Sequence, residues 1–369
     1  NLQALRNAAR KETRALAEER ARHPFDDITT APIDYLPKAW SQPDGTLQDT
    51  VYEAYDLQAI RIDGAAEHPT ALVQSTAMAS VPPPVPTYRP ILPKNLVQDG
   101  LLSAPQLESV IYAGNAHETH LKGWFKRGEI EGQLMAAAEG DEGAFRLRKG
   151  WFLGDGTGCG KGRQVAGIIL DNWLKGRRRA VWVSKSDKLI EDARRDWIAL
   201  GGRESDIVPL SKFRQGSDIR LPEGILFVTY ATLRSAEREG KASRLDQVTS
   251  WLSDGFDGVI AFDESHAMAN AAGEKSDRGD KKASQQGLAG LALQNAAPDA
   301  RVLYVSATGA TVVGNLAYAS RLGLWGTGDF PFVTRAEFVA AMEAGGIAAM
   351  EMISRDLKAL GLYLARSLS

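Results

Sequence analysis

The residues most suited to chemistry lie in a glycine-rich stretch, GWFLGDGTGCGKGRQVAGII, at positions 150–169. Four glycines at alternate positions from 154 to 160 let the backbone curl so that successive N–H groups face one anion. A helix that begins near Lys161 adds the positive end of its dipole, and the Lys161 ammonium can neutralise the β and γ phosphates. The stretch therefore predicts a loop that binds a nucleoside triphosphate.

Two positions depart from the usual phosphate-loop pattern. Asp155 stands where a glycine is common, and Gly162 follows Lys161 where Ser or Thr usually supplies a hydroxyl to Mg²⁺. Either a water molecule replaces that hydroxyl, because Mg²⁺ keeps several waters, or Thr157 supplies one. Cys159 is either a thiol whose pKa the helix end lowers or a small residue that fills a tight bend.

Acidic residues follow a second apolar run, in the sequence GVIAFDESHAMAN at 258–270. Asp263 is placed to hold Mg²⁺, and Glu264 is placed to orient and polarise an attacking water. His266 is either a satisfied hydrogen-bonding residue or a link between the nucleotide and the parts of the protein that move, and we expect the second role.

The texture of the chain after residue 100 predicts one α/β fold that would gather these groups. Continuous apolar runs of strand length alternate with amphipathic helices, which is typical of a parallel sheet covered on both faces. Ligands of such sheets bind at the carboxyl ends of the strands. Ser306 and Thr308 end one of these runs and so belong at the same edge. The runs are RAVWVS (179–184), GILFVTY (224–230), GVIAFDE (258–264) and RVLYVSAT (301–308).

Composition excludes several classes of protein. The 369 residues are 44% hydrophobic and 24% charged, with a net charge of -2 and a single cysteine. These values predict a globular, cytoplasmic protein with no disulfide framework and no membrane span. Any surface that binds nucleic acid must be local. Because the chain begins with Asn rather than Met, we expect it to be part of a longer polypeptide.

The order of the loop, DESH and SAT resembles motifs I, II and III of superfamily-two helicases, especially the Swi/Snf-type translocases, which also carry Asp at the position of Asp155. LSAPQLESVIYA (102–113) is similar to their glutamine motif, which makes Gln106 a candidate for reading the adenine. AVWVSKSDKLIEDARRDW and ILFVTYATLR resemble their segments that touch a nucleic-acid backbone. This implies contacts from Lys185, Lys188 and Thr229.

A closer resemblance, from about residue 50 to the end, is to the Strawberry notch family of helicase-like ATPases. It rests on GDGTGCGKGRQVAGII, ARVLYVSATGA, NLAYASRLGLWGTG and the upstream EHPTALVQSTAMASVPPPVPTYRP. In that family Gly follows the lysine, so Gly162 is the family's form. The texture fits a bacterial or phage member. Such relatives are often large, and some are fused to DNA methyltransferase domains and linked to restriction or anti-restriction.

The resemblance implies a RecA-like P-loop NTPase domain with a mostly parallel, doubly wound sheet, ATP and Mg²⁺ as cofactors, and DNA or RNA as partner. Lys161 and Glu264 would be catalytic. The nucleotide contacts would be Gln106, Asp155, Gly156, Thr157, Gly158, Cys159, Gly160, Lys161, Gly162 and Arg163. The expected organisation is a charged helical arm and linker (1–48), an extended Pro-rich segment packed on the core (49–98), the first RecA-like ATPase domain (99–335) and a helical extension (336–369).

That extension would lead to a second RecA-like domain, which in this architecture carries an arginine finger that contributes ~10³-fold or more to the rate. Without it, we expect the chain to bind ATP and hydrolyse it poorly. One alternative is a nucleotide-dependent regulatory or scaffolding module without turnover. A small-molecule kinase is a further alternative, but the sequence offers no clear acceptor site or lid.

Three other signals favour ordinary explanations at least as strongly as functional ones. KGRRR (175–179) either contacts DNA or completes a helix end, where cations favour the dipole. HETH (117–120) lacks the further ligands that zinc requires. Residues 270–286 are polar and charged, which predicts a mobile loop that orders on DNA or on the partner domain.

Overall fold

A seven-stranded parallel sheet forms the centre of the computed structural model. The strand order is β11-β12-β10-β13-β14-β9-β15, and every adjacent pair is parallel. The strands are β9 (Trp151–Leu153), β10 (Arg179–Ser184), β11 (Ile207–Pro209), β12 (Gly224–Thr229), β13 (Val259–Phe262), β14 (Arg301–Val305) and β15 (Tyr363–Leu364). The structure describes residues 2–42, 51–129, 134–235, 240–269, 284–307 and 316–369.

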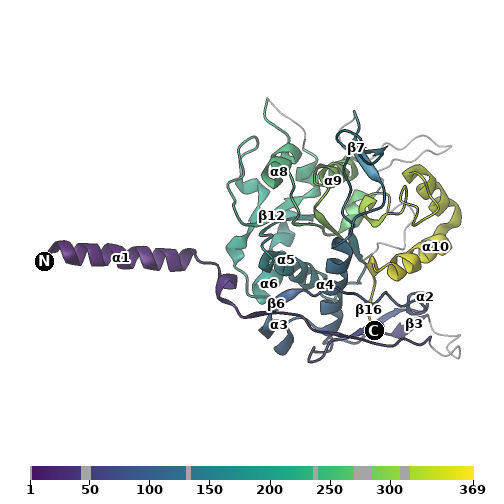
Figure 1. The fold of residues 1–369 in the computed structure, drawn as a ribbon, viewed down its shortest axis with the longest axis horizontal. Helices are drawn as coiled ribbons and strands as arrows, with labels where there is room; N and C mark the ends of the chain where they lie inside the picture. The colour runs from purple at the N-terminus through teal and green to yellow at the C-terminus, as the bar shows by residue number, and fades with distance from the viewer. Residues whose placement is uncertain (1, 43–50, 130–133, 236–239, 270–283, 308–315) are drawn as a thin grey trace.

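Two groups of helices cover the sheet. Helix α5 packs against both α4 and α6, whereas α7, α8 and α9 pack against one another. Figure 1 shows the sheet around β12 running between α5 and α6 on one side and α8 on the other. The apolar runs of the strands are therefore buried on both faces, as predicted. The helices are α4 (Ala104–His117), α5 (Lys161–Leu174), α6 (Ile190–Ala199), α7 (Tyr230–Leu233), α8 (Arg244–Leu252) and α9 (Gln285–Ala296).

The helix after the glycine loop owes its position to one apolar face. Val165, Ile168, Ile169 and Trp173 are each at most 1% exposed, so this face of α5 is buried. On α6, Ala193 and Trp197 form a similar buried face, with Trp197 fully inaccessible. Packing of these faces fixes how the start of α5 meets its neighbours.

The segment before residue 99 packs on the helical layer through short strands and an aromatic cluster. The ring of Phe25 lies 5.5 Å from that of Trp197 and 6.4 Å from that of Trp173. His23 Nε2 lies 2.8 Å from Asp206 Oδ2, and both residues are buried. The short elements are η1 (Pro24–Asp27), β1 (Thr30–Pro32), β2 (Leu36–Pro37), β3 (Tyr52–Ala54), β4 (Ile60–Arg61), β5 (Leu72–Ser75), α2 (Thr76–Ala79), β6 (Ile91–Pro93) and α3 (Lys94–Gln98).

The two ends of the chain behave differently. Helix α1 (Leu2–Ala21) projects away from the rest of the molecule (Figure 1). The C-terminal region was expected to be helical from 336 to 369, but α10 (Arg335–Ala359) ends before the chain does. Gly361, with φ 77°, turns the chain so that β15 joins the main sheet beside β9. The last strand, β16 (Ser367–Leu368), pairs with β5.

The remaining elements are short. A hairpin of β7 (Trp124–Arg127) and β8 (Leu134–Ala137), which the sequence analysis did not predict, stands outside the main sheet. The other 3₁₀ turns are η2 (Asp187–Leu189), η3 (Glu204–Asp206), η4 (Leu210–Lys212), η5 (Ser265–Met268) and η6 (Ser320–Leu322). In the part of the chain that the structure describes, no helix has the length and apolar character needed to cross a bilayer.

Candidate nucleotide site

The glycine loop connects β9 to α5 at the carboxyl edge of the sheet. Gly158 and Gly160 have φ values of 88° and 81°, a conformation that residues with a side chain rarely adopt. Lys161 is the first residue of α5, and its Nζ donates a hydrogen bond to the Gly156 carbonyl at 3.2 Å. Thr157 and Gly158 are exposed at the tip. The loop thus folds the lysine back over its own backbone beside an exposed turn.

Asp155 is held by a buried ion pair that the sequence analysis missed. Both of its carboxylate oxygens accept hydrogen bonds from the Arg366 guanidinium, each at 2.9 Å, and Gln164 donates another at 3.0 Å. Asp155 and Arg366 are at most 1% exposed. The carboxylate therefore faces the interior and anchors the loop, while the nucleotide contact expected of Asp155 stays a prediction.

Gln106 and Cys159 meet on the inner side of the loop. The Gln106 amide donates to the Cys159 carbonyl at 3.3 Å, and its oxygen accepts from the Ser103 backbone N–H at 3.0 Å. Cys159 is 1% exposed, and burial, with help from the Asp155 charge, raises the pKa of its thiol to about 11. Of the two roles considered for Cys159, a lowered pKa is wrong, because burial outweighs the helix end. The small residue in a tight bend is what the structure contains.

The second and third residues of α5 face a carboxylate on the neighbouring helix. Arg163 donates from Nε to Asp196 Oδ1 at 3.3 Å and from Nη1 to the Leu101 carbonyl at 3.2 Å. A Cβ placed on Gly162 would lie 2.2 Å from Asp196 Oδ2. The position where other P-loops carry Ser or Thr is therefore filled by the side chain of Asp196.

The acidic pair follows β13, as predicted. Asp263 accepts hydrogen bonds from the Trp182 indole at 3.4 Å and from the Glu264 backbone N–H at 2.9 Å. Burial and the neighbouring Glu264 carboxylate raise the pKa of Asp263 to about 6, whereas Trp182 and the Lys161 charge act in the opposite direction. Because β14 alone separates β13 from β9 in the parallel sheet, the acidic pair and the glycine loop lie at the same carboxyl edge.

Glu264 adopts a backbone conformation that is unusual for a residue with a side chain. Its φ of 48° and ψ of 46° are left-handed, and its side chain is 35% exposed. Such strain costs on the order of 1–2 kcal/mol and is characteristic of functional sites. His266 lies between Glu264 Oε2, at 3.4 Å from its Nδ1, and Ser306 Oγ, at 3.0 Å. Thr308, predicted to act with Ser306, lies outside the described residues.

The donor set at this edge fits magnesium. Mg²⁺ prefers oxygen ligands and usually binds through one or two carboxylates, water and substrate phosphates, without a full cage of protein ligands. A magnesium site of this kind does not require three or more metal-binding side chains in one cluster. The described residues contain no such cluster. Asp263 is the carboxylate that directly follows β13, and Asp196 lies against the helix that carries Lys161.

The three residues predicted to touch nucleic acid differ in access. Lys185 and Lys188 are exposed just after β10. Thr229 is 5% exposed at the end of β12, and its hydroxyl accepts the Thr232 backbone N–H as the cap of α7. Lys185 and Lys188 are therefore the accessible candidates of the three.

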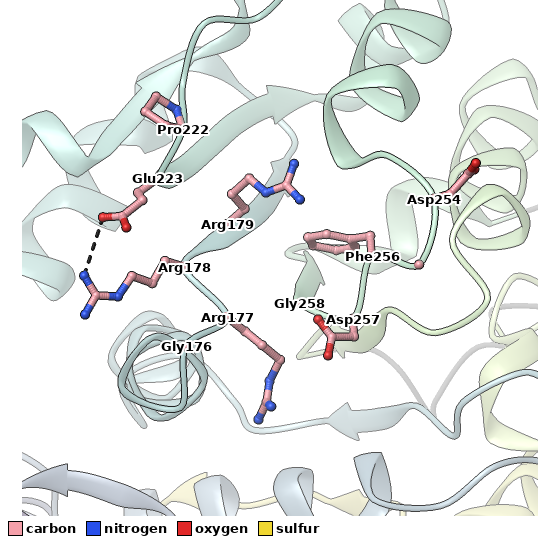
Figure 2. Close-up of a pocket in the computed structure, with 11 residues that line it drawn as sticks. Gly176, Arg177, Arg178, Arg179, Pro222, Glu223, Asp254, Phe256, Asp257 and Gly258 are labelled. Carbon is pink, nitrogen blue, oxygen red and sulfur yellow. Dashed lines mark ion pairs between the residues drawn. The ribbon is translucent and has the colours of Figure 1, made fainter.

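The KGRRR cluster lies at the opposite edge of the sheet, where the strands begin. Its residues 176–179 line a pocket of about 250 Å³ (Figure 2) together with residues that precede β12 and β13. Arg178 pairs with Glu223 at 3.5 Å and with Asp26 at 2.8 Å, and Arg179 lies over the Trp251 and Phe256 rings. These local partners, with Asp254 and Asp257 also lining the pocket, offset the positive charge. Lys175 is the C-cap residue of α5, which fits the helix-end interpretation, and the DNA contact stays a prediction.

Two further signals from the sequence are the HETH motif (117–120) and the polar segment at 270–286. His117 Nε2 donates a hydrogen bond to the Val302 carbonyl at 2.9 Å, and burial lowers the pKa of His117 to about 3. His120 lies 3.6 Å from Asp299. Most of the predicted mobile loop at 270–286 lies outside the described residues.

Comparison with known proteins identifies the family of this chain. The family model for "P-loop containing NTP hydrolase pore-1" matches residues 67–369. The chain belongs to this family. It is 39% identical to the rat protein strawberry notch homolog 1 over 321 residues, and 41% identical to the mouse protein strawberry notch homolog 2 over 305 residues. These alignments cover 85% and 82% of this chain but only 23% and 20% of those proteins.

A solved Sulfolobus solfataricus SWI2/SNF2 ATPase core in complex with dsDNA matches 59% of this chain and 40% of its own, with 14% identity and a TM-score of 0.37. That likeness is too low to assign any property here. The predicted Strawberry notch relationship and the P-loop NTPase fold are both confirmed by the family match.

The sequence analysis did not identify two residues that lie at the candidate site, Arg366 and Asp196. Arg366 could have been suspected, because it is the single charge in the apolar run GLYLARSL. Asp196 gave no signal, since only the packing of α6 on α5 brings it to Gly162.

Proposed function

We propose that this chain binds ATP with Mg²⁺ and forms the first motor domain of a helicase- or translocase-like ATPase that hydrolyses ATP in a nucleic-acid-dependent way. The observation that carries the proposal is the meeting of two groups at one sheet edge. Lys161 begins α5 after the glycine loop that follows β9, and Asp263 and Glu264 follow β13, which only β14 separates from β9 in the parallel sheet.

Each residue has a distinct role in the proposed reaction. The loop amides and Lys161 bind and orient the triphosphate, and Asp263 would hold Mg²⁺. When bound, the ion would neutralise charge on the phosphates as the terminal bond breaks. Glu264 orients the attacking water and accepts its proton at the carboxylate. Gln106, whose amide contacts the loop backbone, would read the adenine.

Coupling to nucleic acid would run through groups beside the acidic pair. His266 bridges Glu264 and Ser306, so a movement of either strand end changes the surroundings of the catalytic carboxylate. Lys185 and Lys188 would contact a phosphate backbone, preferably of DNA. A second RecA-like domain would complete the site, and association with a methyltransferase stays a prediction. The chain spans about a quarter or less of the curated relatives it matches, so these properties belong to the proposal.

Replacing Lys161 with Ala should weaken binding of a Mg²⁺-ATP analogue by roughly 10–100-fold, because one charge-assisted contact to the phosphates is lost. Calorimetric titration of both proteins measures this directly. Lys212→Ala removes an exposed lysine from η4, at the far edge strand, and should bind like the parent. Equal affinity of Lys161→Ala and the parent would contradict the proposed site.

A further inference from the structure

The space beside the glycine after the P-loop lysine is occupied by the carboxylate of Asp196. A Cβ at Gly162 would lie 2.2 Å from Asp196 Oδ2 and 3.3 Å from Asp196 Cγ. Side-chain carbons do not approach other atoms so closely, so any larger residue would displace the carboxylate. The hydroxyl oxygen of a Ser or Thr would be one bond away from that Cβ. An oxygen of Asp196 therefore already occupies the neighbourhood in which other P-loops place their hydroxyl.

Asp196 is held there by its own helix and by Arg163. It follows Ala193 and precedes Trp197, both buried positions that fix α6 against the domain. Arg163 Nε contacts Oδ1 at 3.3 Å, which leaves Oδ2 as the atom directed towards Gly162. The Asp196 side chain retains 18% exposure, so solvent and ligands can reach it. The carboxylate is thus positioned rather than freely mobile.

We propose that Asp196 supplies the magnesium ion of the bound nucleotide with the oxygen ligand that Ser or Thr supplies in other P-loops. The inference rests on the proposed function and adds a metal ligand from outside the loop. A carboxylate is a stronger magnesium ligand than a hydroxyl, because it is charged. The same charge repels a triphosphate when no metal is present. Asp196 should therefore tie nucleotide binding closely to magnesium.

The test compares nucleotide binding with Mg²⁺ and with EDTA, using a fluorescent, non-hydrolysable ATP analogue and the whole chain. Asp196→Asn keeps the shape of the side chain and removes its charge. The ratio of affinities with and without Mg²⁺ should fall about 10-fold or more. Binding in EDTA should stay equal or become tighter, because the repulsion is gone. A merely structural role would weaken both conditions together. Binding of Mn²⁺ with the analogue, followed by its EPR signal, should weaken in parallel.

A matched control and a rescue variant separate the alternatives. Asp192→Asn removes the same charge one turn earlier on α6, from a side chain that is 53% exposed and pairs with Arg195, and should keep the parental ratio. Gly162→Ser combined with Asp196→Ala should regain Mg²⁺ dependence, because the hydroxyl enters the vacated space.

The outcomes that overturn the two proposals are different. A parental ratio in Asp196→Asn would overturn this inference alone and leave Asp196 as a packing partner of Arg163. Loss of affinity by the same factor in both conditions would overturn it as well. Absence of Mg²⁺-dependent binding in the parent protein would overturn the proposed function, and the inference with it.

Discussion

Replacing Arg366 with Met should lower the free energy of unfolding by about 3–5 kcal/mol. Arg366 is 1% exposed, and its guanidinium pairs with Asp155 at 2.9 Å and with Glu108 at 3.1 Å. Both carboxylates are fully buried, so removal of the cation leaves them without their main partner. Burial raises the pKa of Glu108, and the Arg366 charge is the largest influence that opposes it. Urea denaturation followed by tryptophan fluorescence measures the change.

A double-mutant cycle gives this prediction its control. Asp155→Asn alone should also destabilise the protein, but Arg366→Met combined with Asp155→Asn should cost less than the sum, with a coupling of about 0.5–3 kcal/mol. Arg195, which lies on α6 with a side chain that is 70% exposed, offers a matched arginine whose change to Met should stay within about 0.5 kcal/mol. A comparable loss from Arg366→Met and Arg195→Met would contradict the assigned ion pair.

The ion pair also has a consequence for the nucleotide loop. The amides of Gly154 and Gly156 donate to the carbonyls of Leu364 and Arg366, each at 2.7 Å, so the C-terminal segment runs along the loop. Arg366→Lys keeps the charge but cannot contact both oxygens of Asp155 in the planar geometry of a guanidinium. This variant should therefore loosen the loop and weaken nucleotide binding at a smaller loss of stability than Arg366→Met.

The sequence was sufficient for local features and insufficient for contacts between distant segments. The apolar runs predicted β10 and β12 within one residue, because a strand buried on both faces has no polar alternation. The glycine loop and the Asp263–Glu264 pair were located for the same reason, since each follows such a run. Asp155 and Arg366 are 211 positions apart, and no periodicity relates them. Similarly, residue 162 meets residue 196 only because α5 and α6 pack side by side.

Strand β15 is a second feature that the sequence alone did not predict. Tyr363 and Leu364 follow a long helix and are too few for a recognisable strand pattern, yet they extend the sheet beside β9. Their strand conformation comes from an available sheet edge rather than from local preference. A prediction based on propensity continued the helix for this reason.

Exchange of Glu264 for Gln should slow single-turnover ATP hydrolysis by about 10²–10⁴-fold, because the carboxylate is the proposed base for the attacking water. Nucleotide affinity should be retained, since Gln preserves the shape of the side chain and removes a negative charge near the phosphates. Phosphate release by excess protein over ATP measures the rate, and calorimetry measures the affinity. Glu191→Gln, an exposed glutamate on α6 that pairs with Arg194, provides the matched control.

The left-handed backbone of Glu264 allows a second variant that separates the role of the carboxylate from that of the backbone. A φ of 48° is tolerated because the tertiary contacts of neighbouring residues hold it, including the bond of 2.7 Å from the Tyr230 hydroxyl to the Asp263 carbonyl. Glu264→Gly would remove the carboxylate and so slow hydrolysis. It should cost little stability, because glycine adopts the left-handed backbone without strain. Replacement of a purely structural residue would lower the free energy of unfolding instead. Unchanged hydrolysis in Glu264→Gln would instead favour a nucleotide-dependent scaffold, in which the strained turn serves to transmit binding through His266 to Ser306.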